Sequence, residues 1–503
     1  MQLGVDFGTT RTIVAYADRG NYPVVPFLDA NGDSHEYFPS IVALDGDELV
    51  YGFAAQQAAE DGAPHLRSFK RELASPEVTI QTRVRVGERE VRLLDLLTGF
   101  FDALRVAIKA ALRGEAKHAV HTIVVGVPAH AHGGQRFLTL EGFRRAGFNV
   151  LGMINEPSAA GFEYTHRRSA TLSAKRNKVI VYDLGGGTFD ASLVHVHGTD
   201  HEVFGSRGLN RLGGDDFDAV LADCALKAAG VARTDFADKD YQALFTECRD
   251  AKERLSPQTK RVMLDVADEP VIVPVGDFYD AAAPLVETTI DVVEPFIGSL
   301  PDGSDADNLA GIYLVGGGSA LPMVGRMLRE RFGRRVFRSP FPAASTAIGL
   351  AIAADEEAGY SLTDRLSRGF GVFREQNGGQ ALSFDEILDR NSPLRMRGRT
   401  TLTRQYRAVH NVGWFRFVEY TKMDDAGIPA GDIFPFAEIV FPFDPDLQAQ
   451  VTSHRRNRRA LHSVPVERRE WSPEIEETYQ IDEHGIVEVK ISDLSTGYTQ
   501  VHA

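Results

Sequence analysis

The stretch that decides the fold is YDLGGGTFD, residues 182–190, which follows the apolar run KVIV (178–181) and precedes ASLVHV (191–196). Apolar, β-branched runs on both sides indicate two strands, so the glycines and carboxylates lie in the bend between them. Glycine lets a backbone approach another group closely, and loops that need such an approach commonly carry function. The bend therefore predicts a ligand site, with phosphate as the leading candidate.

A second stretch near the N-terminus repeats this plan. VDFGTTRTIVAYA (5–17) and YDLGGGTFDASLV (182–194) each consist of a strand, Asp-x-Gly, a bend of small residues and a second strand. Consecutive N–H groups and threonine hydroxyls in such bends can hold phosphate, and an aspartate can hold a hydrated Mg²⁺. We therefore expect two halves that clamp a di- or triphosphate, with Asp6 and Asp183 as the metal-binding residues.

Two further glycine clusters are expected to complete the site. YLVGGGSALP (313–322) consists of a strand, a glycine turn and a helix start, and LGGDDFD (212–218) is similar, with Asp215 and Asp216 interpreted as helix caps. The N–H groups of a helix start can bind an anion, whereas close packing of strand on helix is the alternative reason for the glycines. The residues expected to bind the nucleotide here and in the two bends are Gly8, Thr9, Thr10, Arg11, Gly185, Gly186, Gly187, Gly213, Gly214, Gly316, Gly317, Gly318 and Ser319.

Length and composition limit the classes of protein. The 503 residues exceed what one core supports, roughly 250–300 residues, and 43% hydrophobic with 25% charged residues is typical of a globular protein. A net charge of −15 argues against nucleic acid or an anionic membrane as partner. Cys224 and Cys248 give no disulfide framework, and no apolar run reaches about 18 residues. We therefore expect a cytoplasmic protein.

The patterning changes along the chain. Strand-like and helix-like periods alternate up to about residue 355, which indicates an α/β architecture for 1–355. The segment EEAGYSLTDRL (356–366) is interpreted as a linker, and the short alternating runs after it predict an all-β sandwich over 367–503. Within the sandwich, the basic segment SHRRNRRALH (453–462) is interpreted as a solvated loop, with partner binding as the alternative.

Together these stretches resemble a known family. DFGTT, SFKREL, VPAHAHGGQR, NVLGMINEPSAAG, YDLGGGTFDAS, LGGDDFD, DAKERLS and YLVGGGSALP follow the order and approximate spacing of the ATPase domain of the 70-kilodalton heat-shock chaperones (DnaK-type), which belongs to the actin/hexokinase superfamily. LSRGFGVF, LDRNSPL and IDEHGIVEVKISDLSTG resemble the β-sandwich of the same family. The resemblance implies a two-lobed, actin-like (duplicated ribonuclease-H-like) ATPase domain followed by a sandwich that binds polypeptide.

The resemblance also assigns roles to single residues. Lys70 matches the lysine that contacts the γ-phosphate and the attacking water, and Glu156 matches the carboxylate that orients this water. A lysine suits developing negative charge, and an ionised carboxylate can accept a hydrogen bond from water. The residues assigned to hydrolysis are Asp6, Lys70, Glu156, Asp183, Thr188 and Asp190.

Four more positions match family residues outside the hydrolytic centre. Lys252 and Ser256, in AKERLS, would hold ribose and adenine. Pro128 and Arg136 resemble the pair that relays the nucleotide state to the neighbouring domain. The alternative is that Pro128 only ends a strand and that Arg136 is a surface residue of a helix.

The sequence also departs from the family pattern. Glu253 stands where the family has an arginine that stacks on adenine, and Ala343 replaces an acidic residue, so we expect weak nucleotide affinity. Gly152 replaces a basic residue linked with J-domain co-chaperones, so dependence on a generic J-protein is not expected. The segment 356–366 keeps only scattered apolar residues of the family linker. Because the chain ends at Ala503, directly after the last expected strand, we expect no helical lid.

Aromatic residues are dense in the expected sandwich. They could line an apolar groove for extended polypeptide, although alternating strand residues more often fill a core. The residues are Trp414, Phe415, Phe417, Tyr420, Phe434, Phe436, Phe441 and Phe443.

The function expected from the sequence is slow ATP hydrolysis coupled to polypeptide binding by the sandwich, as in a chaperone. The expected cofactors are ATP or ADP and Mg²⁺, with K⁺ as a further candidate. The expected partner is unfolded or extended polypeptide, or one dedicated protein client, with co-chaperones as additional candidates. The first alternative is a nucleotide-sensing scaffold with little turnover that recruits a dedicated partner. Two weaker alternatives are an actin-like filament former and a small-molecule kinase.

Overall fold

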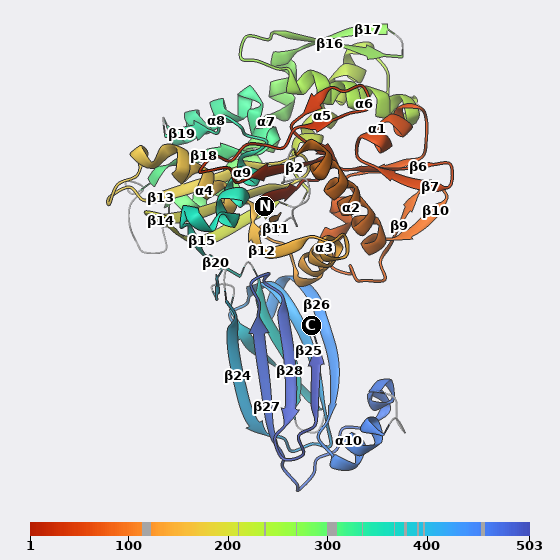
Figure 1. Cartoon of the computed structure of the whole chain (residues 1–503), viewed down its shortest axis with the longest axis vertical. Coiled ribbons are helices and arrows are strands. Elements are labelled where there is room, and N and C mark those ends of the chain that lie inside the picture. Colours follow the sequence, from red (N-terminus) through yellow and green to blue (C-terminus); the bar gives the residue numbers. More distant parts are fainter. Residues whose placement is uncertain are drawn as a thin grey trace.

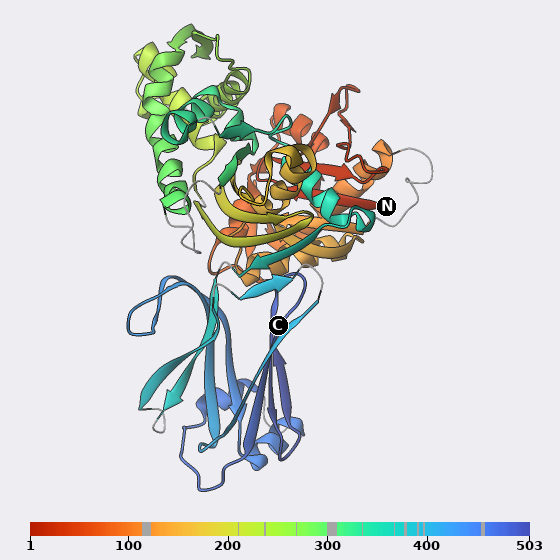
Figure 2. The ribbon, with the colours of Figure 1, turned by 90° about the vertical axis from the view of Figure 1, so that its left-hand side faces the viewer.

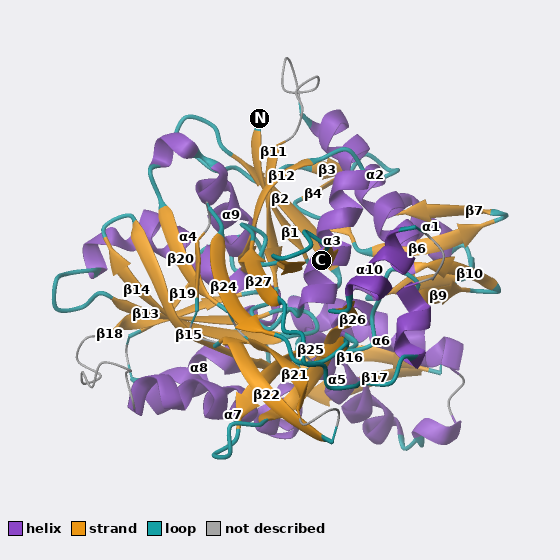
Figure 3. Cartoon of the chain, turned by 90° about the horizontal axis from the view of Figure 1, so that it is seen from below, coloured by secondary structure: helices purple, strands orange, loops and turns teal. Residues whose placement is uncertain are grey.

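The chain folds into a two-lobed α/β domain with a β-sandwich below it (Figure 1). In the view of Figure 2 the strands of the sandwich extend away from the α/β domain, and in Figure 3, seen from below, they lie in front of it. The computed structural model describes residues 1–112, 122–209, 211–235, 238–267, 269–298, 309–333, 335–366, 368–376, 380–389, 392–395, 398–453 and 458–502. Among these residues, no helix is both long and apolar enough to span a bilayer.

Each lobe is built on one large sheet. The first sheet contains, in spatial order, β12 (Asn149–Asn155), β11 (Thr122–Val127), β1 (Gln2–Phe7), β2 (Arg11–Tyr16) and β5 (Phe38–Pro39). The second contains β19 (Val336–Arg338), β18 (Leu309–Val315), β13 (Lys178–Leu184), β14 (Phe189–His197), β15 (Asp200–Leu209), β20 (Ser361–Arg365) and β23 (Pro393–Arg395).

The two sheets share one topology, which confirms the duplication predicted from DFGTT and DLGGGTFD. In each sheet an antiparallel hairpin, β1–β2 or β13–β14, is extended on one side by two parallel strands. On its other side each hairpin pairs with a further antiparallel strand, β5 or β15. The order β12-β11-β1-β2-β5 thus matches β19-β18-β13-β14-β15 strand for strand. Asp6 and Asp183 are both the penultimate residue of the first hairpin strand, so they occupy equivalent places.

Two helices pack between the sheets. α4 (Glu156–Arg168) and α9 (Ser345–Ala354) are almost wholly buried, and their small residues let backbones come close. A Cβ on Gly349 would lie 1.8 Å from the carbonyl oxygen of Ala159, and a Cβ on Gly4 would lie 2.2 Å from the amide nitrogen of Ala351. These glycines therefore fix how near α9 lies to α4 and to β1, and so how near the two lobes lie to each other.

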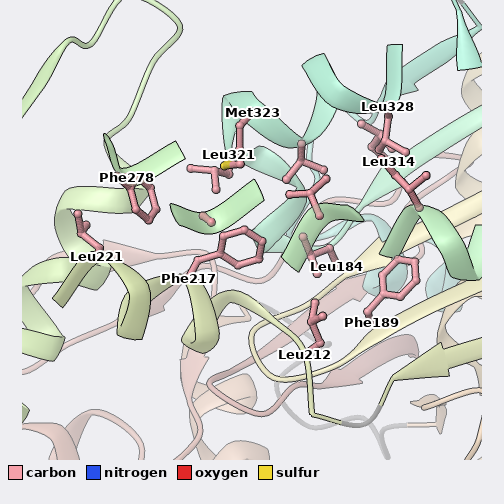
Figure 4. Packing of buried hydrophobic residues seen from close by; sticks show 14 of the residues in the cluster. Leu184, Phe189, Leu212, Phe217, Leu221, Phe278, Leu314, Leu321, Met323 and Leu328 are labelled. Carbon is pink, nitrogen blue, oxygen red and sulfur yellow. The ribbon is translucent and has the colours of Figure 1, made fainter. Parts of the chain in front are cut away.

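Helices on the outer faces complete the lobes. α2 (Leu93–Ala111) and α3 (Gly133–Arg145) cover the first sheet, where Phe7, Phe100 and Phe101 pack in one core cluster. In the second lobe, Figure 4 shows Leu184, Phe189, Phe217 and Leu314 in one cluster of buried apolar residues. The remaining helices of the domain are α1 (Phe53–Glu60), α5 (Gly214–Ala229), α6 (Asp238–Glu253), α7 (Val275–Gly298) and α8 (Pro322–Phe332), with short 3-10 turns η1 (Phe69–Ala74), η3 (Ser169–Thr171), η4 (Arg233–Asp235), η6 (Gly317–Ala320) and η7 (Glu356–Ala358).

Small antiparallel sheets lie at the edges of both lobes. They are formed by β3 (Phe27–Leu28) with β4 (Ser34–His35), by β7 (Glu48–Tyr51), β6 (Ile41–Asp45) and β8 (His65–Arg67), by β10 (Arg89–Arg92) with β9 (Arg83–Val86), and by β16 (Arg261–Val266) with β17 (Glu269–Pro274).

The sandwich predicted after the linker is present as two four-stranded sheets. One contains β22 (Ala381–Leu388), β21 (Gly369–Gln376), β25 (Val412–Met423) and β26 (Pro429–Pro442); the other contains β24 (Thr400–Arg407), β27 (Glu474–Ile481), β28 (Val487–Asp493) and β29 (Thr499–His502). The helix α10 (Pro445–Thr452), which the sequence analysis did not anticipate, lies at the end far from the α/β domain (Figure 1).

The dense aromatic residues of the sandwich mostly fill its core. Phe415, Phe417, Phe441 and Phe443 are buried between the two sheets. Phe434 instead lies at the boundary with the α/β domain, where its ring stacks on His132 with 4.8 Å between centroids. The alternative interpretation, core packing, therefore holds for most of this set. Of the basic segment 453–462, residues 454–457 lie outside the described residues, and η8 (Arg458–Ser463) is a short 3-10 helix.

The segment interpreted as a linker carries a strand. β20 pairs in parallel with β15 of the second lobe, from Asp200↔Ser361 to Glu202↔Thr363, and antiparallel with β23 of the C-terminal part. The hydroxyl of Ser158 in α4 also donates to Asp364 at 3.0 Å. A five-residue strand with polar alternate positions has little hydrophobic pattern, so only a connection could be predicted here. β20 thus joins the sheet of the second lobe to β23, a strand of the C-terminal part.

Gly349→Ala should destabilise the α/β domain, because the added methyl group would overlap the backbone of α4. Overpacking of this kind costs about 1–3 kcal/mol, so the apparent midpoint of thermal unfolding should fall. Gly325→Ala in α8 is the matched control, since its Cβ would meet the side chain of Arg329 at 3.4 Å, an ordinary contact. It should be neutral or stabilise by about 0.4–1 kcal/mol. Equal midpoints for the two variants would contradict the close helix packing.

Candidate functional site

A pocket lies between the lobes where the two bends face each other. Asp6 and the loop 8–10 form one wall, and the loop 185–188 with Asp183 forms the other. The third glycine cluster closes one side. The predicted site residues that line the pocket are Asp6, Gly8, Thr9, Thr10, Arg11, Lys70, Glu156, Asp183, Gly185, Gly186, Thr188, Gly214, Lys252, Gly316, Gly317 and Gly318.

The glycine bend is held by the start of α5. The amide of Gly214 donates to the carbonyl of Gly185 at 2.9 Å, and the amide of Asp215 donates to Gly186 at 2.8 Å. A Cβ on Gly213 would lie 2.5 Å from the amide nitrogen of Gly187, so these two glycines permit close contact of loop and helix. This contact leaves the pocket side of residues 185, 186 and 188 open to a ligand.

Five predicted residues lie outside the pocket wall. Gly187 and Gly213 pack against each other, and Asp190 is buried behind the bend. The hydroxyl of Ser319 donates to the carbonyl of Gly316 at 2.8 Å, and the hydroxyl of Ser256 lies 3.0 Å from that of Thr259. Any contact of these five residues with a ligand stays a prediction.

The two aspartates after the LGG turn differ in role. Asp216 accepts a hydrogen bond from the amide of Gly213 at 2.8 Å, so it helps to cap α5 from the third helical position, whereas the N-cap residue itself is Gly213. Asp215 instead forms ion pairs with Arg71 at 3.2 Å and Arg249 at 3.4 Å, so the cap predicted for it is wrong. Because Arg71 belongs to the first lobe and Asp215 to the second, this pair crosses the cleft. Sequence reasoning missed Arg71 and Arg249, which belong to no glycine motif.

The carboxylates of the site lack enough positive charge to balance them. Burial and the neighbouring charge of Glu156 raise the pKa of Asp183 to about 7, and the same causes hold the pKa of Asp6 and of Asp190 well above the usual range. Asp183 accepts a weak hydrogen bond from Thr346 at 3.5 Å, a residue that the sequence analysis did not single out. The ionised forms of these side chains are therefore destabilised in the empty pocket.

Lys70 and Glu156 form an ion pair at the base of the pocket. The Lys70 ammonium group donates to Glu156 at 2.8 Å, and only 8% of each residue is exposed. Burial alone would lower the pKa of Lys70, but the charges of Glu156 and Asp6 outweigh it and raise the pKa. Water is largely excluded from this contact, and there an ion pair interacts more strongly than in bulk solvent.

The donor set fits a hydrated Mg²⁺. Among the described residues no group of three or more His, Cys, Asp or Glu side chains could enclose a metal ion. Mg²⁺, however, is commonly bound by one or two carboxylates, with phosphate and water completing its shell. Asp6 and Asp183 provide two such carboxylates, and their raised pKa values mark them as acceptors that lack a cation. They are the residues that would hold the ion.

The outer part of the pocket differs in character. Arg11 forms an ion pair with Glu253 at 2.8 Å, and its guanidinium lies 4.5 Å from the ring centroid of Tyr37. Lys252 pairs with Asp218 at 2.6 Å. Ala343 also lines this part, so a small apolar side chain stands where the family resemblance led us to expect an acidic one. Arg11 and Glu253 bridge the lobes at the mouth of the pocket.

Arg136 connects the pocket to the sandwich. Its guanidinium donates to the side chain of Asn155 at 2.6 Å, directly before Glu156, and to the backbone carbonyl of His484 at 3.2 Å. His484 belongs to the turn between β27 and β28. Pro128 is buried at the end of β11, and its carbonyl accepts from the amide of Ala131 at 3.0 Å. Arg136 is therefore buried between domains, so it is not a surface residue.

Comparison with known proteins agrees with this geometry. A family model described as "Hsp70 protein" matches residues 2–366. Chaperone protein HscA of Citrobacter koseri is 31% identical over 370 residues, which cover 71% of this chain and 58% of that protein. The HscA proteins of Cronobacter sakazakii and Klebsiella pneumoniae are each 32% identical, over 371 and 374 residues, with the same two coverages of 71% and 58%. The chain thus spans less than two thirds of the length of these relatives.

Asp183→Asn should stabilise the empty protein at pH 8. The folded chain holds Asp183 with a pKa of about 7, above the value of about 3.9 for an unfolded chain, so its ionised form costs stability above pH 7. The gain should be on the order of a few kcal/mol at most and should shrink as the pH falls below 7, because the wild-type side chain then binds a proton. The midpoint of thermal unfolding between pH 8 and 5.5 measures this.

Mg²⁺ with ADP should reverse this order, since only the wild-type carboxylate can ligate the ion. Ligand should raise the midpoint of the wild type at pH 8 and raise that of the variant much less. Asp47→Asn, at an exposed position, is the control and should change neither property. A destabilised variant, or an equal ligand response in both proteins, would contradict the assignment of Asp183.

Proposed function

This chain belongs to the Hsp70 family, and we propose that it is a chaperone-like protein that hydrolyses ATP between its lobes and couples the nucleotide state to polypeptide binding by its sandwich. The observation that carries the proposal is the Lys70–Glu156 ion pair at 2.8 Å, lying between the two duplicated Asp-x-Gly bends. Phosphate-binding loops alone would support binding only. A buried ammonium and an ionised carboxylate beside them supply what hydrolysis needs.

The residues of the pocket have separate tasks in this proposal. Backbone N–H groups of loops 8–10 and 185–188 bind the phosphate oxygens, and the Thr188 hydroxyl adds a donor. Lys70 stabilises the negative charge that develops on the transferred phosphoryl group. Glu156, held in place by its hydrogen bond from Lys70, accepts a hydrogen bond from the attacking water and orients it. Mg²⁺ held by Asp6 and Asp183 would neutralise phosphate charge when bound.

The connection to the sandwich supports the coupling. Glu156 begins α4, and the residue before it, Asn155, accepts from Arg136, which also donates to the sandwich turn at His484. A shift of Glu156 on nucleotide binding therefore moves a hydrogen-bonded neighbour of the sandwich. β20 gives a second connection, because it pairs with β15 of the second lobe and with β23 of the C-terminal part. Unfolded or extended polypeptide is the proposed client, with co-chaperones as further partners.

One observation favours a second candidate function. Arg11 and Glu253 bind each other at the mouth of the pocket, so neither guanidinium nor carboxylate is free for the base. A nucleotide-sensing scaffold with little turnover would tolerate such a weakened base site. It would recruit one dedicated protein rather than many unfolded chains.

Lys70→Ala and Glu156→Gln should each lower the rate of ATP hydrolysis by about 10²–10³-fold, which is the usual cost of removing one group that stabilises the transition state. Steady-state release of phosphate in the presence of Mg²⁺ measures the effect. Lys227→Ala and Glu287→Gln, at exposed positions of α5 and α7, are matched controls and should retain the wild-type rate.

The same assay separates the two candidate functions. Stimulation of turnover by several unrelated unfolded polypeptides supports the chaperone-like protein. Nucleotide binding with negligible turnover, unaffected by any of these polypeptides, favours the scaffold. Turnover that is unchanged in both Lys70→Ala and Glu156→Gln would overturn the assigned centre.

A further inference from the structure

The joint between the α/β domain and the sandwich contains a buried histidine from each side. His484 lies in the turn between β27 and β28 and is 1% exposed, and His132 caps the start of α3 and is 4% exposed. Both meet arginine side chains, so their protonation states bear directly on how the two domains fit.

His484 accepts a hydrogen bond from an arginine. The guanidinium of Arg144 lies 3.2 Å from Nε2 of His484, and that of Arg136 donates to the His484 carbonyl at 3.2 Å. A guanidinium has only donors and stays charged, so Nε2 must offer a lone pair and the ring must be neutral. A proton on Nε2 would point at Arg144 and place a third cation beside two others, since the Glu483 carboxylate, 3.8 Å from the same atom, lies beyond hydrogen-bond distance.

His132 is constrained in the same way. Its Nδ1 accepts from the amide of Gln135 at 3.4 Å, so this atom also needs a lone pair. Its ring stacks on Phe434 of the sandwich, and the same Phe434 ring lies 3.8 Å from the guanidinium of Arg368. Arg368 in turn donates to the carbonyl of His130 at 3.0 Å. A charged His132 would thus be desolvated near Arg368.

We propose that this joint is proton-sensitive: the sandwich docks on the α/β domain only while His132 and His484 are neutral, and mild acid releases it. The proposal deepens the coupling proposed above, because it adds regulation by pH to the contact through which the pocket reaches the sandwich.

The charged groups around both rings determine whether a fall in pH weakens or strengthens docking. His484 faces Arg136 and Arg144 from α3 and Asp482 and Glu483 from its own turn; burial outweighs the two carboxylates and lowers its pKa. Burial and then Arg368 lower the pKa of His132 to about 4. After undocking, both rings return toward the ordinary value of about 6.5. Docking is therefore favoured above that pH and weakens as the pH falls below it.

Glu419 is the acidic group at the same joint and acts in the opposite direction. Both of its carboxylate oxygens accept from the amide of Gly133 at 3.0 Å, and burial raises its pKa. Acid therefore protonates Glu419 more readily in the docked state. Glu419 opposes the histidines with one carboxylate, whereas protonation of two rings weakens docking, so the net response to mild acid follows the histidines.

The test is small-angle scattering of the full chain without nucleotide, from pH 8 to pH 5.5. The radius of gyration should rise as the sandwich separates, because the docking equilibrium falls by up to tenfold per pH unit for each histidine. His132→Asn with His484→Asn should remove most of this rise, since asparagine can cap α3 and can accept from Arg144 but does not titrate. His65→Asn, at an exposed position, is the control and should respond like the wild type.

Three outcomes would overturn the proposal: a constant radius in the wild type, an unchanged acid response in the double variant, or equal loss of the response in His65→Asn. If the double variant is already undocked at pH 8, the NMR titration of His132 and His484 in the unmodified chain decides. Both pKa values below 6 support the proposal, and values near 6.5 overturn it. Because no nucleotide is present, loss of the proposed ATPase function would leave this result unaffected.

Discussion

The ammonium group of Lys70 lies among the side chains of Asp6, Glu156, Asp183 and Asp190, so one basic group faces four acidic ones. The arrangement of both lobes around the pocket depends on this contact. Burial, and after it the charge of Glu156, raises the pKa of the three aspartates, and the charge of Lys70 offsets only part of this shift. A chain that folds around such a charge gives up stability for the ability to bind a cation together with polyphosphate. The duplicated sheets bring the carboxylates together, since each hairpin places one aspartate at the same point of its strand.

The pocket lies between the lobes, so its shape depends on how closely the lobes pack against each other. Gly4 and Gly349 bring α9 against β1 and α4, so the helix that starts with Glu156 is packed tightly between the sheets. Movement of Glu156 cannot be absorbed by loose packing in such an interior. In the proposed function such a movement reaches the sandwich turn through Arg136, which donates hydrogen bonds to Asn155 and to the carbonyl of His484. The two histidines at this joint make the same contact depend on pH.

Much of the fold could be predicted from the sequence because its signals are local. The two Asp-x-Gly bends, the apolar runs beside them and the alternation of periods fix the two sheets and the sandwich. Most predicted phosphate-binding glycines line the pocket for the same reason, since a bend between two strands can be located from its neighbours. Gly187 and Gly213 were the exceptions, because a glycine that permits packing and one that approaches a ligand look alike in sequence.

The rest depends on contacts between distant residues. Nothing near Arg11 shows that it pairs with Glu253, and nothing near Asp215 shows that Arg71 reaches it across the cleft. The strand β20 was missed because its hydrogen-bonding partners come from both domains and its own pattern is weak. His132 and His484 lie 352 positions apart in the sequence. Only the docking of the sandwich on the α/β domain brings them into one joint.

In the proposed function, the pocket between the lobes and the sandwich are connected through Arg136 and β20. Amide hydrogen exchange of β20 tests this connection most directly, because β20 pairs with strands of both parts and its residues do not line the pocket. The protection of residues 361–365 from exchange should differ between the protein with Mg²⁺ and ATP and the protein with Mg²⁺ and ADP. Identical protection in the two states, with nucleotide bound in both, would contradict it.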